Sequence, residues 1–156
     1  FESKIVLKRR AATLLRRAFE KPTWKGELVV FSGNTDCYQP LEASYELTRA
    51  CLEVCAEYRN PAGIITKGAL VVRDLDLLTR LHRIAWTRVY FSIPFADEGV
   101  ARIMEPHAPS ITKRWSDAKV GRTQLPSMAR SACAAATSSR ASASAVKAMG
   151  CARVSA

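Results

Sequence analysis

A short polar loop after an apolar segment supplies the residues best suited to chemistry. The apolar run ends at Phe31, and the loop that follows contains Gly33, Asn34, Thr35 and Asp36. The Asp36 carboxylate can accept a hydrogen bond from an ammonium group, and Gly33 allows close approach to the backbone because it lacks Cβ. Ligands of α/β proteins bind at loops of this kind, after the carboxyl ends of strands. An ordinary turn is the alternative, since Gly, Asn and Asp are common turn residues.

Two further apolar segments end in polar residues. Thr66 and Lys67 follow the segment 62–65, and Ser92 lies near the end of 89–93. Their side chains can hydrogen-bond a ribose or a carboxylate. On a parallel sheet we expect them at the same edge as Asp36, because the carboxyl ends of the strands meet there. A polar cluster that only meets solvent is an equally good interpretation.

Alternating strand-like and helix-like patterns predict how these residues are positioned. We expect strands at 4–7, 27–31, 63–66 and 89–93, and helices at 11–20, 45–58, 75–85 and 98–104. Asp74 and Asp97 are the expected N-caps of the last two helices. The alternation indicates parallel βαβ units, so the predicted fold class is α/β with about four βα units. The pattern leaves open whether these form a partial barrel or an open sheet.

Several strings of the chain resemble a known family. They are 32–42 (SGNTDCYQPLE), 47–53 (LTRACLE), 64–78 (IITKGALVVRDLDLL) and 102–110 (RIMEPHAPS). They resemble radical SAM proteins of the spore photoproduct lyase-like type, also described as DNA repair photolyase-like. The likeness extends from residue 1 to about 114. It favours part of a radical SAM (β/α) barrel.

The resemblance also implies chemistry. Members of that family use a 4Fe–4S cluster to cleave S-adenosylmethionine to a 5′-deoxyadenosyl radical, and a lyase role in DNA repair is implied. The resemblance places Gly33, Asn34, Thr35 and Asp36 in the loop that holds the methionine part of the cofactor. Thr66, Lys67 and Ser92 are assigned to the cofactor by position only, and no catalytic residue is implied.

The cluster-binding motif of that family, CxxxCxxC, is absent from the chain. Cys51 and Cys55 supply its first half, but Tyr58 stands where the third Cys is required. These residues follow helical spacing, so we interpret the two Cys as core residues and assign no metal ligand. We therefore expect an amino-truncated and inactive piece of a radical SAM enzyme.

The formal charge of +10 suggests an alternative function. Arg9 and Arg10 lie seven residues before Arg16 and Arg17, so these cations could share a helix face and bind phosphates. A solvated helix face is more common, and no aromatic residues interleave to stack bases. A basic nucleic-acid-binding module without catalysis is the alternative hypothesis.

The domain organisation follows composition. Residues 1–114 form the expected core domain, whereas 115–156 are rich in Ala and Ser and nearly lack large aliphatic side chains. We expect this tail to be poorly ordered or frame-shifted, with an Ala/Ser-rich linker as the alternative. Before the tail, Arg102 and Glu105 are expected to form an ion pair on a helix surface.

Composition also bears on location. The five Cys show no pairing pattern, which indicates a reducing compartment. No apolar run is long enough to span a bilayer, so we expect a cytoplasmic protein without a membrane partner. The oligomeric state is left open.

Overall fold

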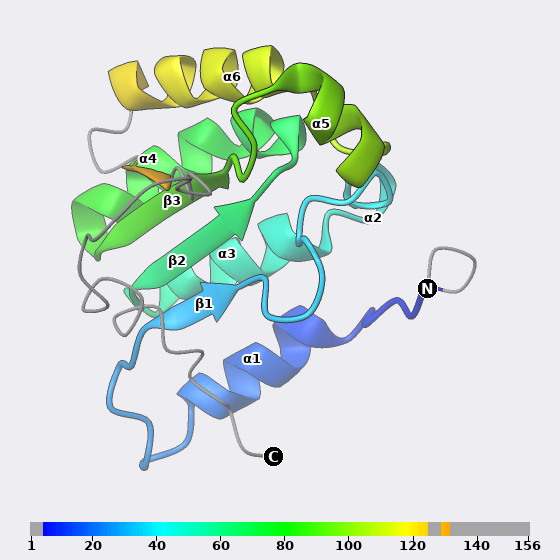
Figure 1. Cartoon of the computed structure of the whole chain (residues 1–156). Helices are drawn as coiled ribbons and strands as arrows, with labels where there is room; N and C mark the ends of the chain where they lie inside the picture. Colours follow the sequence, from blue (N-terminus) through cyan, green and yellow to red (C-terminus); the bar gives the residue numbers. More distant parts are fainter. Residues whose placement is uncertain (1–4, 125–128, 132–156) are drawn as a thin grey trace, which may run out of the picture.

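The computed structural model describes residues 5–124 and 129–131 of the 156-residue chain. These residues form an α/β fold (Figure 1). The strands are β1 (Val29–Phe31), β2 (Ala62–Thr66), β3 (Thr87–Ser92) and β4 (Ala129–Ser131). The helices are α1 (Ala11–Phe19), α2 (Glu42–Tyr45), α3 (Leu47–Glu57), the 3-10 helix η1 (Ala69–Asp74), α4 (Leu75–Ile84), α5 (Glu98–Met104) and α6 (Ile111–Gln124).

The strands form one parallel sheet in the order β1-β2-β3-β4. Gly63 pairs with Val30 on one side and with Arg88 on the other. Because sequence order and spatial order agree, each helical crossover returns the chain to the neighbouring strand. The predicted α/β class and the parallel strands are confirmed.

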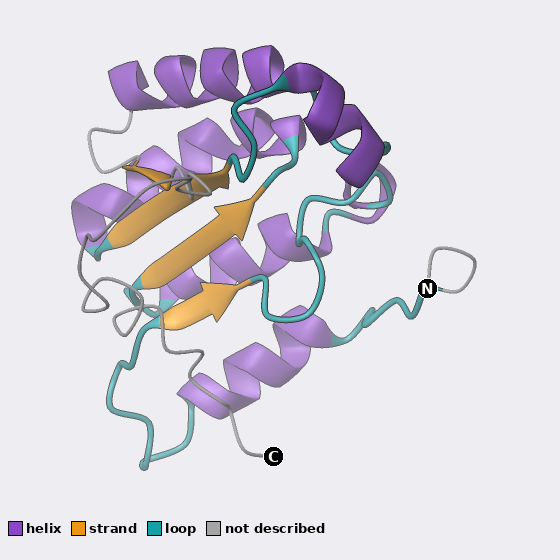
Figure 2. Cartoon of the chain, in the orientation of Figure 1, coloured by secondary structure: helices purple, strands orange, loops and turns teal. Residues whose placement is uncertain are grey.

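Helices α3 and α4 lie behind β2 and β3 (Figure 2). β3 shows the corresponding alternation, since Val89 and Phe91 are fully buried whereas Tyr90 and Ser92 are partly exposed. Successive side chains of a strand point to opposite faces, so one face of β3 meets the core. The core continues through the fully buried helical residues Leu52, Leu78 and Leu81.

Most of the helix predictions are confirmed. The helices α1, α3, α4 and α5 lie where the periodicity placed them, within the usual uncertainty of helix ends. Asp97 caps α5, because its Oδ1 accepts a hydrogen bond from the backbone N of Val100 at 2.8 Å. The predicted helix 45–58 is divided at Glu46, whose φ of 48° lies in the left-handed region.

One local prediction is wrong, and the expected N-cap of α4 is confirmed in position only. Residues 5–7 of the expected first strand form no strand, and the chain there lies beside the segment 35–48 rather than in the sheet. Asp74 precedes α4, but its side chain makes no capping hydrogen bond. Its carboxylate is bound instead by Arg49, Arg73 and Tyr38.

Helix α6 crosses residue 114, where the composition changes. The short β4 then pairs with the end of β3, with Ser131 opposite Ser92. The rest of the Ala/Ser-rich tail, residues 125–128 and 132–156, lies outside the described residues. Within the described ranges, no helix combines the length and apolar character that a membrane span requires.

Candidate ligand-binding site

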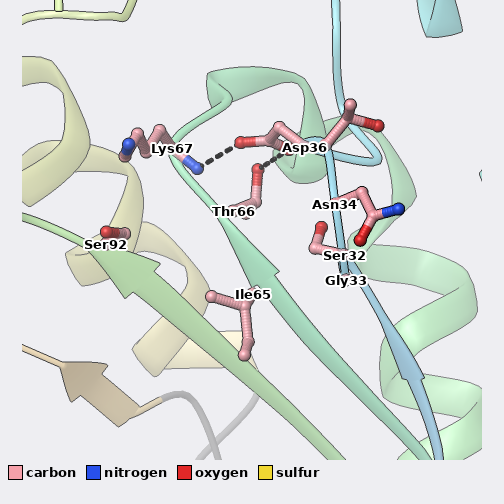
Figure 3. A pocket seen from close by; sticks show the side chains of 9 residues that line it. Ser32, Gly33, Asn34, Asp36, Ile65, Thr66, Lys67 and Ser92 are labelled. Atoms are coloured by element: carbon pink, nitrogen blue, oxygen red, sulfur yellow. Dashed lines mark hydrogen bonds between the residues drawn. The ribbon is translucent and has the colours of Figure 1, made fainter. Parts of the chain in front are cut away.

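The carboxyl ends of β1, β2 and β3 surround a hollow of about 220 Å³ (Figure 3). It is lined by Ser32, Gly33, Asn34, Thr35, Asp36, Ile65, Thr66, Lys67 and Ser92. Every residue that the sequence assigned to cofactor binding is in this set, and Ser32 and Ile65 are additions. The structure thus brings these residues to one place, and their role there stays a prediction.

Asp36 connects the loop after β1 to the end of β2. Its Oδ1 accepts hydrogen bonds from Thr66 Oγ1 at 2.6 Å and from the backbone N of Tyr38 at 2.9 Å. Its Oδ2 accepts from the backbone N of Lys67 at 2.6 Å (Figure 3). A carboxylate offers roughly four acceptor positions, so these three donors leave capacity for one more. Asp36 is therefore held in place and can still accept from a ligand.

Gly68 makes this junction possible. A Cβ at Gly68 would lie 2.6 Å from the carbonyl oxygen of Tyr38 and 2.9 Å from its Cβ. The backbone N of Gly68 donates to Thr66 Oγ1 at 2.8 Å, which leaves the Thr66 hydroxyl proton for Asp36. Sequence reasoning missed Gly68, because a required close approach cannot be read from one glycine.

The backbone of the loop 32–35 is accessible at Gly33, as the sequence predicts. A Cβ built at Gly33 meets no atom within 4 Å, so nothing in the described chain covers this backbone. Ser32 has a φ of 89°, which is uncommon for a residue with a side chain. Its Oγ accepts from the backbone N of Cys37 at 3.1 Å, which closes the loop on itself.

The Lys67 side chain forms an ion pair with Glu105, which does not line the hollow. Its Nζ lies 2.5 Å from Glu105 Oε1, and Arg114 Nη2 lies 2.9 Å from Glu105 Oε2. The expected pair of Arg102 with Glu105 is therefore wrong. Glu105 follows the last residue of α5 with φ −135° and ψ 63°, so the helical three-residue spacing no longer applies there.

The charge state of Glu105 follows from these contacts. Burial by itself would raise the pKa of this carboxyl group, but hydrogen bonds from Lys67 and Arg114 outweigh burial and lower the pKa. Glu105 is therefore ionised at neutral pH. Because two cations face one anion, the group of three residues carries one net positive charge beside the hollow.

Arg114 is buried, with 1% of its surface exposed. It donates from Nη1 to the carbonyl of Ser92 at 3.0 Å and from Nε to the carbonyl of Pro109 at 2.7 Å. The end of β3 and the ion pair of Lys67 are thus joined through one guanidinium group. Sequence reasoning found no signal for this role.

A second ionic cluster, centred on the buried carboxylate of Asp74, holds the same loop in place. Asp74 accepts from Tyr38 Oη at 3.0 Å, from Arg49 at 2.8 Å and from Arg73 at 2.8 and 2.9 Å. Arg73 also contacts Glu42, whose carboxylate accepts from the backbone N of Thr48. Tyr38 lies two residues after Asp36, so this cluster fixes the loop that carries the site.

The described cysteines are poor metal ligands. Cys51 and Cys55 are buried in α3, as the helical spacing predicted, and burial raises their pKa values to about 11 and about 12. Burial likewise raises the pKa of Cys37 to about 12. Metal-binding sulfur is a thiolate, and these thiols are neutral at physiological pH. No group of three or more His, Cys, Asp or Glu side chains suited to a metal occurs among the described residues.

The basic residues of α1 are partly engaged within the fold. Arg16 forms an ion pair with Glu57 and lies 5.8 Å from the ring centroid of Tyr58. Arg9, just before the helix, lies 5.5 Å from the ring centroid of Tyr45. The nucleic-acid-binding alternative stays a prediction.

Fold and site together define an α/β protein with a polar hollow at the carboxyl ends of parallel strands. Uncharacterized proteins of Mycobacterium tuberculosis and Mycobacterium bovis are each 32% identical over 110 residues, which is 70% of this chain and 32% of the relative. An uncharacterized protein of Methanocaldococcus jannaschii is 33% identical over 90 residues, which is 58% of this chain and 33% of the relative. The chain thus spans about a third of the length of the curated relatives it matches. No family model and no solved structure matches the chain.

Proposed function

We propose that this chain is part of a radical SAM-type (β/α) barrel and that its hollow holds the methionine part of S-adenosylmethionine. The observation that carries the proposal is the placement of Asp36 and Lys67 on the wall of one hollow. A free α-amino acid has an ammonium and a carboxylate. Asp36 supplies an acceptor for the ammonium, and Lys67 supplies a cation for the carboxylate.

The size of the hollow supports a site that holds only part of the cofactor. Sites that enclose a drug-sized ligand have volumes of roughly 300–1,000 Å³. The hollow measures about 220 Å³ and therefore suits the amino-acid end of the cofactor rather than the whole molecule. Gly33 gives the ligand access to backbone, and Ser92 adds a hydroxyl group at the end of β3. The Thr66 hydroxyl is engaged by Asp36 and Gly68 and holds the loop in place.

The described residues do not fit a 4Fe–4S cluster, because no group of three or more metal-ligating side chains occurs among them and Cys51 and Cys55 are buried in α3. In a radical SAM enzyme, thiolate-bound iron supplies the electron that cleaves the cofactor. We derive no such step for this chain, whose proposed part is to bind and orient the amino-acid end. The proposal for the whole protein is a radical SAM lyase acting in DNA repair.

Gly33→Ala tests the proposal with little disturbance of the fold. The added methyl group meets open space, so the free energy of unfolding should stay within about 0.5 kcal/mol of the wild type. A ligand that approaches this backbone would meet the methyl group, and we expect at least a roughly tenfold loss of affinity, or about 1.4 kcal/mol. Isothermal titration calorimetry with S-adenosylmethionine measures the dissociation constants of the wild-type chain and of Gly33→Ala, and urea unfolding measures their stabilities.

Lys67→Met provides a second test, with Lys25→Met as the matched control. Lys25 is exposed in the loop before β1 and does not line the hollow. We expect a weaker affinity for S-adenosylmethionine in Lys67→Met and an unchanged affinity in Lys25→Met. Absence of binding to the wild-type chain, or equal affinities in all variants, would overturn the proposal.

A further inference from the structure

Lys67 is a flexible residue held in a specific place. Lys67 lines the hollow, its side chain is 40% exposed, and its ammonium is paired with Glu105. A free lysine side chain loses rotamer entropy when it is fixed. A group that fixes the ammonium before the ligand arrives therefore improves binding.

Glu105 can serve as such a group because it is itself anchored. Its second oxygen is bound by Arg114, whose side chain is only 2% exposed and which also holds the carbonyl groups of Ser92 and Pro109. If Glu105 moved away, the buried guanidinium group of Arg114 would lose its carboxylate partner, which is costly for a buried charge. Glu105 is thus tied to the scaffold.

We infer that Glu105 and Arg114 are positioning residues that hold the Lys67 ammonium toward the carboxylate of the bound amino acid. This inference rests on the proposed function and assigns a role to two residues outside the hollow. Lys67 has three N–H donors, and the contact with Glu105 Oε1 leaves donors for a ligand. The net positive charge of the three residues still attracts an anion.

The opposite role for Glu105 would be competition, in which its carboxylate occupies Lys67 and must leave when a ligand binds. The anchoring by Arg114 argues against that role, because the cost of leaving is high. The two roles also differ in sign. Removal of a competitor raises the affinity for a carboxylate ligand, and removal of a positioning group lowers it.

The test compares two ligands, S-adenosylmethionine and its decarboxylated analogue, which lacks the α-carboxylate. Glu105→Asp keeps the charge but shortens the side chain by one methylene group, so it separates position from charge. We expect Glu105→Asp to weaken binding of S-adenosylmethionine by about tenfold, the equivalent of one charged hydrogen bond. Affinity for the decarboxylated analogue should change by less than about twofold, since that ligand does not use Lys67.

Glu98→Asp is the matched control. Glu98 Oε2 accepts from the backbone N of Ile111 at 3.0 Å and so joins α5 to α6 without lining the hollow. We expect this variant to bind both ligands as the wild type does. Thermal unfolding identifies variants that are folded at the temperature of the titration. Glu105→Gln, which nearly keeps the shape, replaces Glu105→Asp if the latter is unfolded, and the expected loss is the same.

The outcomes separate the two proposals. An equal loss for both ligands in Glu105→Asp would show a purely structural role, and a gain in Glu105→Gln would show competition, so either would overturn the inference. A wild-type chain that binds both ligands equally well would show that Lys67 does not use the carboxylate, and would overturn it too. A wild-type chain that binds neither ligand would overturn the proposed function itself.

Discussion

The carboxylate of Asp36 and the hydroxyl group of Thr66 meet at 2.6 Å, although the two residues are 30 positions apart in the chain. This contact joins the loop after β1 to the last residue of β2 and forms the floor of the hollow. It also fixes the direction of the Thr66 proton, because the same oxygen accepts from the backbone N of Gly68. The local geometry of the site therefore depends on one carboxylate.

Asp36→Asn should destabilise the chain by about 1–3 kcal/mol, because at least one buried donor would then face an amide NH₂ group. Each carboxylate oxygen of Asp36 accepts from a backbone N, that of Tyr38 or that of Lys67, and neither of these donors can accept from that group. Urea unfolding followed by circular dichroism measures the change. Asp76→Asn is the control, since Asp76 is exposed and pairs with Arg49 at the surface, where about 0–1 kcal/mol is expected. Equal effects of the two substitutions would contradict the structural role of Asp36.

Gly68→Ala should destabilise the chain by about 1–3 kcal/mol through steric overlap with Tyr38. The φ of Gly68 is −75°, so backbone strain does not contribute and the effect is one of space alone. Gly33→Ala is the same substitution in open space and should leave the unfolding midpoint nearly unchanged. The comparison of the two urea midpoints is the measurement, and a Gly68→Ala chain as stable as the wild type would disprove the close approach.

Asp74 should make the stability sensitive to acid. Burial alone would raise the pKa of this carboxyl group, but hydrogen bonds from Arg73, Arg49 and Tyr38 lower it below the ordinary 3.8. The ionised group therefore contributes stability that is complete above about pH 4 and is lost as the pH falls through the lowered pKa. Urea unfolding at a series of pH values between 2 and 7 should show this loss.

Asp74→Asn should be destabilised by about 3–5 kcal/mol at neutral pH, because two guanidinium groups lose their buried partner. Its stability should also depend less steeply on pH below 4 than that of the wild type. Parallel pH profiles for the two chains would mean that folding does not lower the pKa of Asp74.

Cys51 and Cys55 should resist alkylation in the folded chain. The thiolate is the reactive form, and burial raises the two pKa values to about 11 and about 12. We expect iodoacetamide at pH 8 to modify the peptide of α3 slowly under native conditions and rapidly in urea, as measured by mass spectrometry. Native modification at the rate seen in urea would show that these thiols are accessible and would reopen a ligand role for them.

The helices and the strand ends were predictable because their signals are local. The three-residue spacing of Leu75, Leu78 and Leu81 predicts the buried face of α4, and all three are buried. The polar residues after each apolar segment predict the lining of the hollow, because parallel strands place their carboxyl ends together. The first expected strand was not predictable in this way, since a strand requires a partner and residues 5–7 have none in the described sheet.

The sequence by itself determined the alternation of the main helices and strands between α1 and α5 and the set of residues at the strand ends, since both follow from hydrophobic periodicity along the chain. Only the tertiary structure decided which charges meet. Glu105 leaves its helix and contacts Lys67 and Arg114 rather than Arg102, and Asp74 binds two arginines rather than the first turn of α4. The physical reason is that a long charged side chain has several possible partners within reach. Which pairing has the lowest free energy depends on burial, and burial depends on the whole fold.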